Sequence, residues 1–166
     1  MLPLAVLAVH CALSTIVFAL LARWYVLPRV SLENERRLLS LFLIVNVFRY
    51  LPLSLYMPGQ VAAEFPEAVK ALVAFGDFTS AMVALVALIL LRNESRLSIP
   101  AVWLFSVVSI LDIVLALWSA LSAKVYELSL GANYFTVVVY VPLLMVVQVL
   151  ILHVLYTTRK RAVSGR

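Results

Sequence analysis

Five apolar segments dominate the chain, and each is 20 to 23 residues long. An α-helix rises about 1.5 Å per residue, so about 20 residues cross the ~30 Å hydrocarbon core of a bilayer. The strict alternation of apolar and polar residues that a β-strand would show is absent. The pattern therefore predicts an all-α, five-transmembrane-helix bundle with helices at residues 2–22, 38–57, 71–91, 101–123 and 134–156.

Turn-forming residues separate these helices. Pro28 follows the first segment, and Pro58 with Gly59 closes the second. Pro100 stands where the first turn of the fourth helix is expected, a position that suits proline because its missing N–H is not needed there. Gly131 precedes the fifth segment. Because no internal repeat or low-complexity tract divides the chain, we expect residues 1–166 to form a single transmembrane domain.

The composition excludes most alternatives to a membrane protein. Of the 166 residues, 65% are hydrophobic and 13% charged, and the mean hydropathy is +1.10. Soluble domains carry about half apolar and about a quarter charged residues, and a chain this short cannot bury so much apolar surface inside itself. Cys11 is the only cysteine, which excludes an internal disulfide and a cysteine-cluster metal site. The first apolar segment is too long for the core of a signal peptide, so we expect it to be retained as a helix.

Basic residues lie mostly on one side of the predicted helices. Loops with an excess of Lys and Arg stay in the cytoplasm, and this excess predicts an N-terminus outside and a C-terminus in the cytoplasm. The sequence thus indicates a multi-pass membrane protein, and we expect it in a bacterial inner membrane. The opposite set of loops holds Lys70 and Lys124, and Arg49 lies within a helix. The larger set holds ten basic residues: Arg23, Arg29, Arg36, Arg37, Arg92, Arg96, Arg159, Lys160, Arg161 and Arg166.

Three charged residues lie inside the apolar segments: Arg49, Asp77 and Asp112. Ionisable residues within membrane spans are costly, and they mark function or a buried pair. Counted from the outer end of each helix by the helical rise, Asp77 lies at ~9 Å, Arg49 at ~12 Å and Asp112 at ~16 Å. On the same count His10 lies at ~12 Å and Tyr140 at ~9 Å. The sequence therefore predicts one polar layer in the outer half of the bundle.

Residues at helical spacing extend this layer. Asn46 shares a face with Arg49, and Ser109 shares one with Asp112. Gly76 begins a run of small residues that permits close helix packing. These faces predict an interior pocket that opens toward the outer leaflet or the outer water. Trp118 admits two interpretations, an anchor at the membrane interface or a wall of the pocket.

The charges admit both a structural and a functional interpretation. Arg49 and Asp77 are expected to form an ion pair, since a single buried charge is expensive. Asp112 then has no basic partner, and we expect desolvation to keep it neutral at pH 7. A protonatable acid beside a pocket suits proton coupling or acid catalysis. The alternative is a protonated Asp112 that only hydrogen-bonds a neighbouring helix.

Several other chemistries have no support in the sequence. It lacks a Gly-rich phosphate loop, an HExxH motif and any Cys/His spacing typical of a metal site, so we expect no cofactor and no metal. His10 and His153 lie at different depths and cannot ligate one iron or metal within one chain. We also expect no nucleic-acid binding, since no basic stretch is interleaved with stacking aromatic residues.

Four features between residues 40 and 160 form a pattern: the segment 51–57 (LPLSLYM), an acid near the outer end of the next helix at Asp77, the proline at Pro100, and Tyr140-Val-Pro142 in the last helix. With these features, residues 40–160 resemble the EXPERA family, which includes emopamil-binding protein and related drug-binding membrane proteins. The resemblance implies a four-helix core with a pocket for an apolar or cationic ligand, to which the first helix is an addition. Pro58 stands where the family has a second acid, so the resemblance does not imply sterol isomerisation. The segment 130–134 (LGANY) is also similar to small bacterial inner-membrane proteins.

Three functions remain open. The first is binding or transport of a membrane lipid or other hydrophobic or amphipathic small molecule, with a site built from Asn46, Arg49, Asp77, Asp112, His10, Tyr140 and Trp118. The second is a membrane-embedded, isomerase-like enzyme that uses Asp77 and Asp112 as acid and base. The third is an accessory or structural subunit whose charges only pack helices. A homo-oligomer also stays open.

The predicted topology can be tested with a reporter enzyme that folds only outside the cytoplasm. Fused after Arg166, the reporter should be inactive, because the positive-inside rule keeps this end in the cytoplasm. An active fusion would overturn the assignment.

Overall fold

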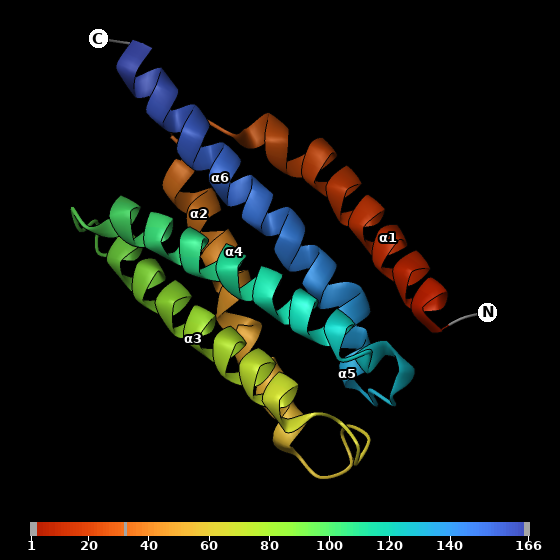
Figure 1. Ribbon diagram of the computed structural model, residues 1–166. Helices are drawn as coiled ribbons and strands as arrows, with labels where there is room; N and C mark the ends of the chain where they lie inside the picture. The colour runs from red at the N-terminus through yellow and green to blue at the C-terminus, as the bar shows by residue number, and fades with distance from the viewer. Residues whose placement is uncertain (1–2, 32, 165–166) are drawn as a thin grey trace.

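The computed structural model describes residues 3–31 and 33–164, and these residues form helices and connecting turns without a strand. Figure 1 shows the long helices lying side by side along their lengths, with the two ends of the chain at opposite ends of the molecule. The α-helices are α1 (Pro3–Leu21), α2 (Glu35–Val47), α3 (Glu67–Arg92), α4 (Ser98–Ser122), α5 (Asn133–Phe135) and α6 (Val141–Ser164). The 3-10 and π-helical segments are η1 (Ala22–Val26), η2 (Leu27–Arg29), η3 (Phe48–Tyr56), η4 (Val125–Glu127) and η5 (Thr136–Tyr140).

Five continuous helical stretches are long and apolar enough to cross a bilayer: Pro3–Arg29, Glu35–Tyr56, Glu67–Arg92, Ser98–Ser122 and Asn133–Thr157. They confirm the five predicted helices within the described residues; the predicted start at Leu2, and Arg166, lie outside that range. Helices α2 and α3 begin before the apolar segments do, so that charged residues, Glu35 and Glu67, lie in their first turns. Acidic residues suit this position, where the helix dipole is positive.

Three prolines explain where the helices depart from α geometry. A proline has no N–H and its ring clashes with the carbonyl four residues earlier, so the α-helical hydrogen bond cannot form there. Pro52 lies in η3, and this 3-10 segment begins at Phe48, four residues before the proline. The π-helical turns η1 and η5 lie just before Pro28 and Pro142 in the same way. The change at Phe48 places Arg49 in the first turn of the 3-10 segment η3, which is wound more tightly than an α-helix.

The core lies between α2, α3, α4 and α6. Its largest cluster contains fully buried side chains such as Leu39 and Leu43 of α2, Phe105 of α4 and Ile151 of α6. Two of the α3 residues that face it, Ala84 and Ala87, are fully buried alanines. Small side chains let neighbouring helices approach closely. In Figure 1, α2 lies behind α4 and α6, and α3 lies beside α4.

Helix α1 lies at the edge of the bundle. It runs along α6 and η5, and none of its residues is buried. The outer faces of α1 and α4 carry exposed large apolar residues, including Leu13 and Ile16 on the first and Leu111 and Leu115 on the second. A continuous apolar surface of this kind is compatible with a lipid environment.

Two loops join at the end of the bundle where α3 begins. The Ala62 N–H donates to the Ser129 carbonyl at 3.0 Å, and Gly131 lies against the backbone of Gln60. Gly131 has φ +53°, and a Cβ there would overlap the Gln60 carbonyl oxygen. Gly59 also has a positive φ, +76°, but nothing lies within 4 Å of its missing Cβ. The two glycines therefore share a backbone constraint and differ in crowding.

This pair of glycines gives a test of the loop packing. Both Gly59→Ala and Gly131→Ala should lose about 1–2 kcal/mol of stability from the left-handed backbone. Only Gly131→Ala must also move the Gln60 carbonyl, so it should lower the thermal unfolding midpoint in detergent further. Equal losses in the two variants would contradict the loop contact.

Candidate functional site

The buried guanidinium of Arg49 is the centre of the polar layer. Arg49 is only 1% exposed and lies in the first turn of η3. Its Nε donates to Asp77 Oδ1 at 2.8 Å, and its Nη1 donates to Ser109 Oγ at 2.6 Å. Its Nη2 contacts two acids, Asp77 Oδ1 at 2.7 Å and Asp112 Oδ2. The three N–H-bearing groups of one side chain thus join η3 to α3 and α4, which confirms the predicted Arg49–Asp77 ion pair.

Asp112 has a basic partner, contrary to the expectation from the sequence. Its Oδ2 accepts hydrogen bonds from Arg49 Nη2 and, at 3.0 Å, from Ser80 Oγ. The expectation was wrong because it matched residues by depth along the helices alone. The arginine side chain is long and has five N–H donors in a planar fork, so it can reach acids on two helices at once. The argument for a neutral, unpartnered Asp112 therefore fails.

Small residues on α3 make room for this cluster. A Cβ added at Gly76 would lie 3.2 Å from the carboxyl carbon of Asp112 and closer still to its Oδ1. Ser80, one turn further along α3, is fully buried and donates to the same carboxyl group. The small run that the sequence predicts to pack helices thus has a second role, because it lets the Asp112 carboxyl group lie against the α3 backbone.

The net formal charge of the Arg49, Asp77 and Asp112 cluster depends on whether it holds a proton. Arg49 contributes +1 and the two acids −2, so the formal charge is −1 when both acids are ionised and zero when one proton is bound. A net buried charge is costly, and Arg49 Nη2 contacts an oxygen of each carboxyl group, which brings the two acids close together. The arrangement can therefore bind one proton, which would belong to the pair of acids rather than to either residue.

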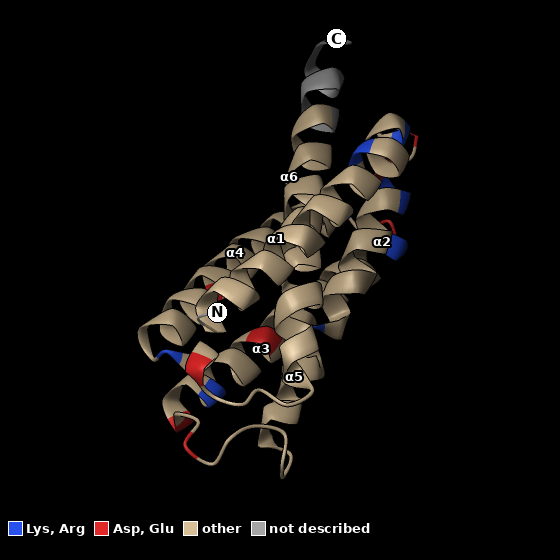
Figure 2. Cartoon of the chain, turned by 90° about the vertical axis from the view of Figure 1, so that its right-hand side faces the viewer, with Lys and Arg blue, Asp and Glu red and all other residues tan. Residues whose placement is uncertain are grey.

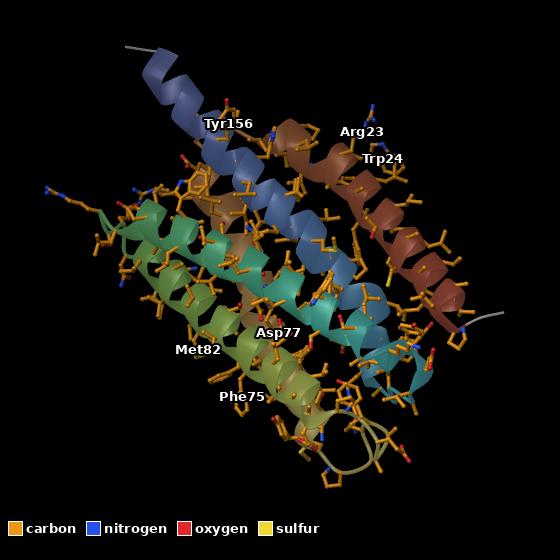
Figure 3. The ribbon with its side chains drawn as sticks, in the orientation of Figure 1. Arg23, Trp24, Phe75, Asp77, Met82 and Tyr156 are labelled. Atoms are coloured by element: carbon orange, nitrogen blue, oxygen red, sulfur yellow. The ribbon has the colours of Figure 1, made fainter. Side chains whose placement is uncertain are left out.

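A cavity of about 150 Å³ borders this cluster at Asp77. Figure 3 shows Asp77 directed into the bundle, whereas Phe75 and Met82 of the same helix point away from it. Most of the lining is apolar and comes from η3, α3, α4 and the start of the last helix, and Leu7 of α1 also lines the cavity. The apolar lining includes Leu55, Phe65, Val69, Val73, Leu117 and Val137.

Three residues with polar side-chain groups line the same cavity besides Asp77: Tyr126, Asn133 and Thr136. Asn133 is buried, and its Oδ1 accepts a hydrogen bond of 2.9 Å from Ser54 Oγ. Asn133 stands directly before the last apolar segment, so the sequence alone indicates only a residue of the break between two helices. A polar residue at the start of an apolar helix could have marked Asn133 as a site residue. Its inward position, however, depends on its contact with Ser54, which lies 79 positions earlier in the chain.

Asn46 and Tyr140 lie near the cluster without binding its charges directly. Asn46 is buried and its Nδ2 donates to the Phe42 carbonyl at 2.8 Å, one turn back in α2. The Tyr140 hydroxyl donates to the Val45 carbonyl at 2.7 Å, close to the point where α2 becomes η3. Both residues thus donate to backbone carbonyls of α2, and neither is among the residues that line the cavity.

His10 and Trp118 do not join the cluster. The His10 Nδ1 atom lies 2.5 Å from the Tyr134 hydroxyl, so His10 links α1 to α5. Trp118 is 73% exposed on the outer face of α4 and does not line the cavity. An interface anchor is the interpretation that fits this position. Among the described residues, no group of three or more His, Cys, Asp or Glu side chains is placed to hold a metal ion.

The comparisons with known proteins give a family but no activity. A family described as a domain of unknown function, DUF8737, matches residues 6–156. The chain belongs to this family. No curated protein and no solved structure matches the chain. The family carries no described function, so the resemblance to the EXPERA family stays a prediction.

The contact between Gly76 and Asp112 can be tested by a pair of variants. Gly76→Ala should destabilise the protein by about 1–3 kcal/mol, because the new methyl group overlaps the Asp112 carboxyl group and overpacking costs this much. In an Asp112→Ala background the same change should cost far less, since the overlapping atoms are gone. Unfolding of the purified protein in mixed detergent measures both steps. A Gly76→Ala loss of equal size in the two backgrounds would refute the contact.

Proposed function

We propose that this protein binds a hydrophobic or amphipathic small molecule inside a membrane-embedded helical bundle, as a binding protein or small transporter. One observation carries the proposal: the apolar cavity of about 150 Å³ reaches the buried Arg49 cluster at Asp77. Binding sites for small molecules are mostly apolar pockets with a few placed polar groups. A cavity of about this size lined by Leu, Ile and Phe binds a benzene-sized ligand in another protein.

The membrane location rests on the five long apolar helices and their exposed apolar faces. The orientation rests on the distribution of basic residues, ten on one side and two on the other. Figure 2 shows most of the blue segments at the end of the molecule where α2 begins, toward the C-terminus, while red and blue segments lie together at the opposite end. The proposed topology therefore keeps the N-terminus and the cavity on the outer side, and the C-terminus in the cytoplasm.

The geometry favours binding or transport over acid–base catalysis by the two aspartates. A catalytic acid and base must both come within about 2.6–3.2 Å of the reacting groups. Asp77 lines the cavity, but Asp112 does not and is held by Arg49 and Ser80. A purely structural role for the charges, as in an accessory subunit, would favour a cluster enclosed by side chains, whereas Asp77 borders open space.

Ligand binding can be tested with toluene and a variant that fills the cavity. Ala120 lines the cavity, so Ala120→Phe should occupy it. Leu115→Phe, on the exposed face of the same helix, is the matched control. Toluene should raise the unfolding midpoint of the wild type and of Leu115→Phe in a saturable manner, because a ligand that binds only the folded state stabilises it.

The cavity-filled variant decides the outcome. Ala120→Phe should show no saturable rise, and any residual effect then measures partitioning of toluene into the detergent. A rise in Ala120→Phe equal to that of the wild type, or none in the wild type, would contradict binding in this cavity.

A further inference from the structure

One residue that lines the cavity, Asn133, carries a buried hydrogen-bond donor without a partner among the described residues. Asn133 lines the cavity and is only 6% exposed. Its Oδ1 is occupied by the Ser54 hydroxyl, whereas its Nδ2 has no hydrogen-bond partner among the described residues. A buried N–H group without a partner costs about 1–3 kcal/mol, so such a group usually meets an acceptor in the functional state.

The other charged groups near the cavity are already paired. Asp77 is the charged residue of the lining, and its Oδ1 receives two nitrogens of Arg49. A cationic ligand would have to approach the Arg49 guanidinium, and an anionic one would have to approach two carboxyl groups. The remaining lining is almost entirely apolar. When the cluster holds one proton its formal charge is zero, and these features then favour a neutral ligand over a charged one.

We propose that the ligand is a neutral, largely apolar molecule of about one ring in size, whose carbonyl or hydroxyl oxygen accepts a hydrogen bond from Asn133 Nδ2. This inference rests on the proposed function, because it specifies the ligand class of the same cavity. The apolar body of the ligand lies against residues such as Phe65, Val69 and Leu117, and its oxygen lies at Asn133. Ser54 positions the amide by holding its oxygen.

The test compares two probes of similar shape, acetophenone and cumene. Acetophenone has a carbonyl oxygen, and cumene has a methyl group in its place. Binding is measured as the saturable stabilisation of the protein in detergent, with Ala120→Phe as the blank for micelle partitioning. Wild-type protein should bind acetophenone about 10-fold more tightly than cumene, since a buried amide that gains a partner is worth about 1.4 kcal/mol.

Two variants test whether the preference for acetophenone over cumene comes from the Asn133 amide. Asn133→Leu should bind both probes with similar affinity, because the donor is lost. Ser54→Ala removes the bond that holds the Asn133 oxygen but keeps the Nδ2 donor, so it should weaken the preference without abolishing it. If Asn133→Leu does not fold, the side-chain amide signal of Asn133 in wild-type NMR spectra gives the same information. This signal should shift with acetophenone and not with cumene.

The outcomes separate this inference from the proposed function. Equal affinity of the wild type for the two probes, as expected if only water meets Nδ2, would overturn the inference and leave ligand binding intact. A preference that survives in Asn133→Leu, or tighter binding of benzylamine than of acetophenone, would overturn it too. Failure of every probe to give a saturable effect that Ala120→Phe removes would refute the proposed function itself.

Discussion

The structure depends on one constraint, that the charge of Arg49 is buried among apolar helices and must be matched there. The guanidinium is 1% exposed and contacts Asp77, Asp112 and Ser109. Removing one partner of a buried ion pair costs about 3–5 kcal/mol, since the other charge is left without compensation. The 3-10 segment at Arg49, the glycine under Asp112 and the serines of α3 and α4 all serve to bring these groups together. The same cluster fixes the polar end of the cavity.

Much of this arrangement follows from the sequence by simple physics. The length of the apolar segments predicts the five helices, and the similar depths of Arg49 and Asp77 predict their ion pair. Pro52 could have predicted the change of helix type at Phe48, because the clash of a proline with the fourth preceding carbonyl is local. These features depend on spacing along one helix or on two neighbouring helices, which the sequence records directly.

Features that depend on three-dimensional reach were not predictable in this way. Counted by helical rise, Asp112 and Arg49 lie at different depths, yet the long Arg49 side chain reaches the Asp112 carboxyl group. Trp118 lies on an apolar face, and periodicity cannot distinguish a face that lines a pocket from one that faces lipid. Asn133 looked like a turn residue until its contact with Ser54 placed it inside. The candidate site depends on contacts of this kind, so the sequence predicted the architecture far better than the site.

The most direct test of this account is a pair of double-mutant cycles that couple Arg49 to each acid. Arg49→Met is combined first with Asp77→Asn and then with Asp112→Asn, and the free energy of unfolding is measured in mixed detergent. The account predicts that both cycles show coupling of about 0.5–3 kcal/mol, the range for residues in one ion-pair network. Additive losses in the Asp112 cycle, with coupling confined to Asp77, would contradict the account of Arg49 as the shared partner of both acids.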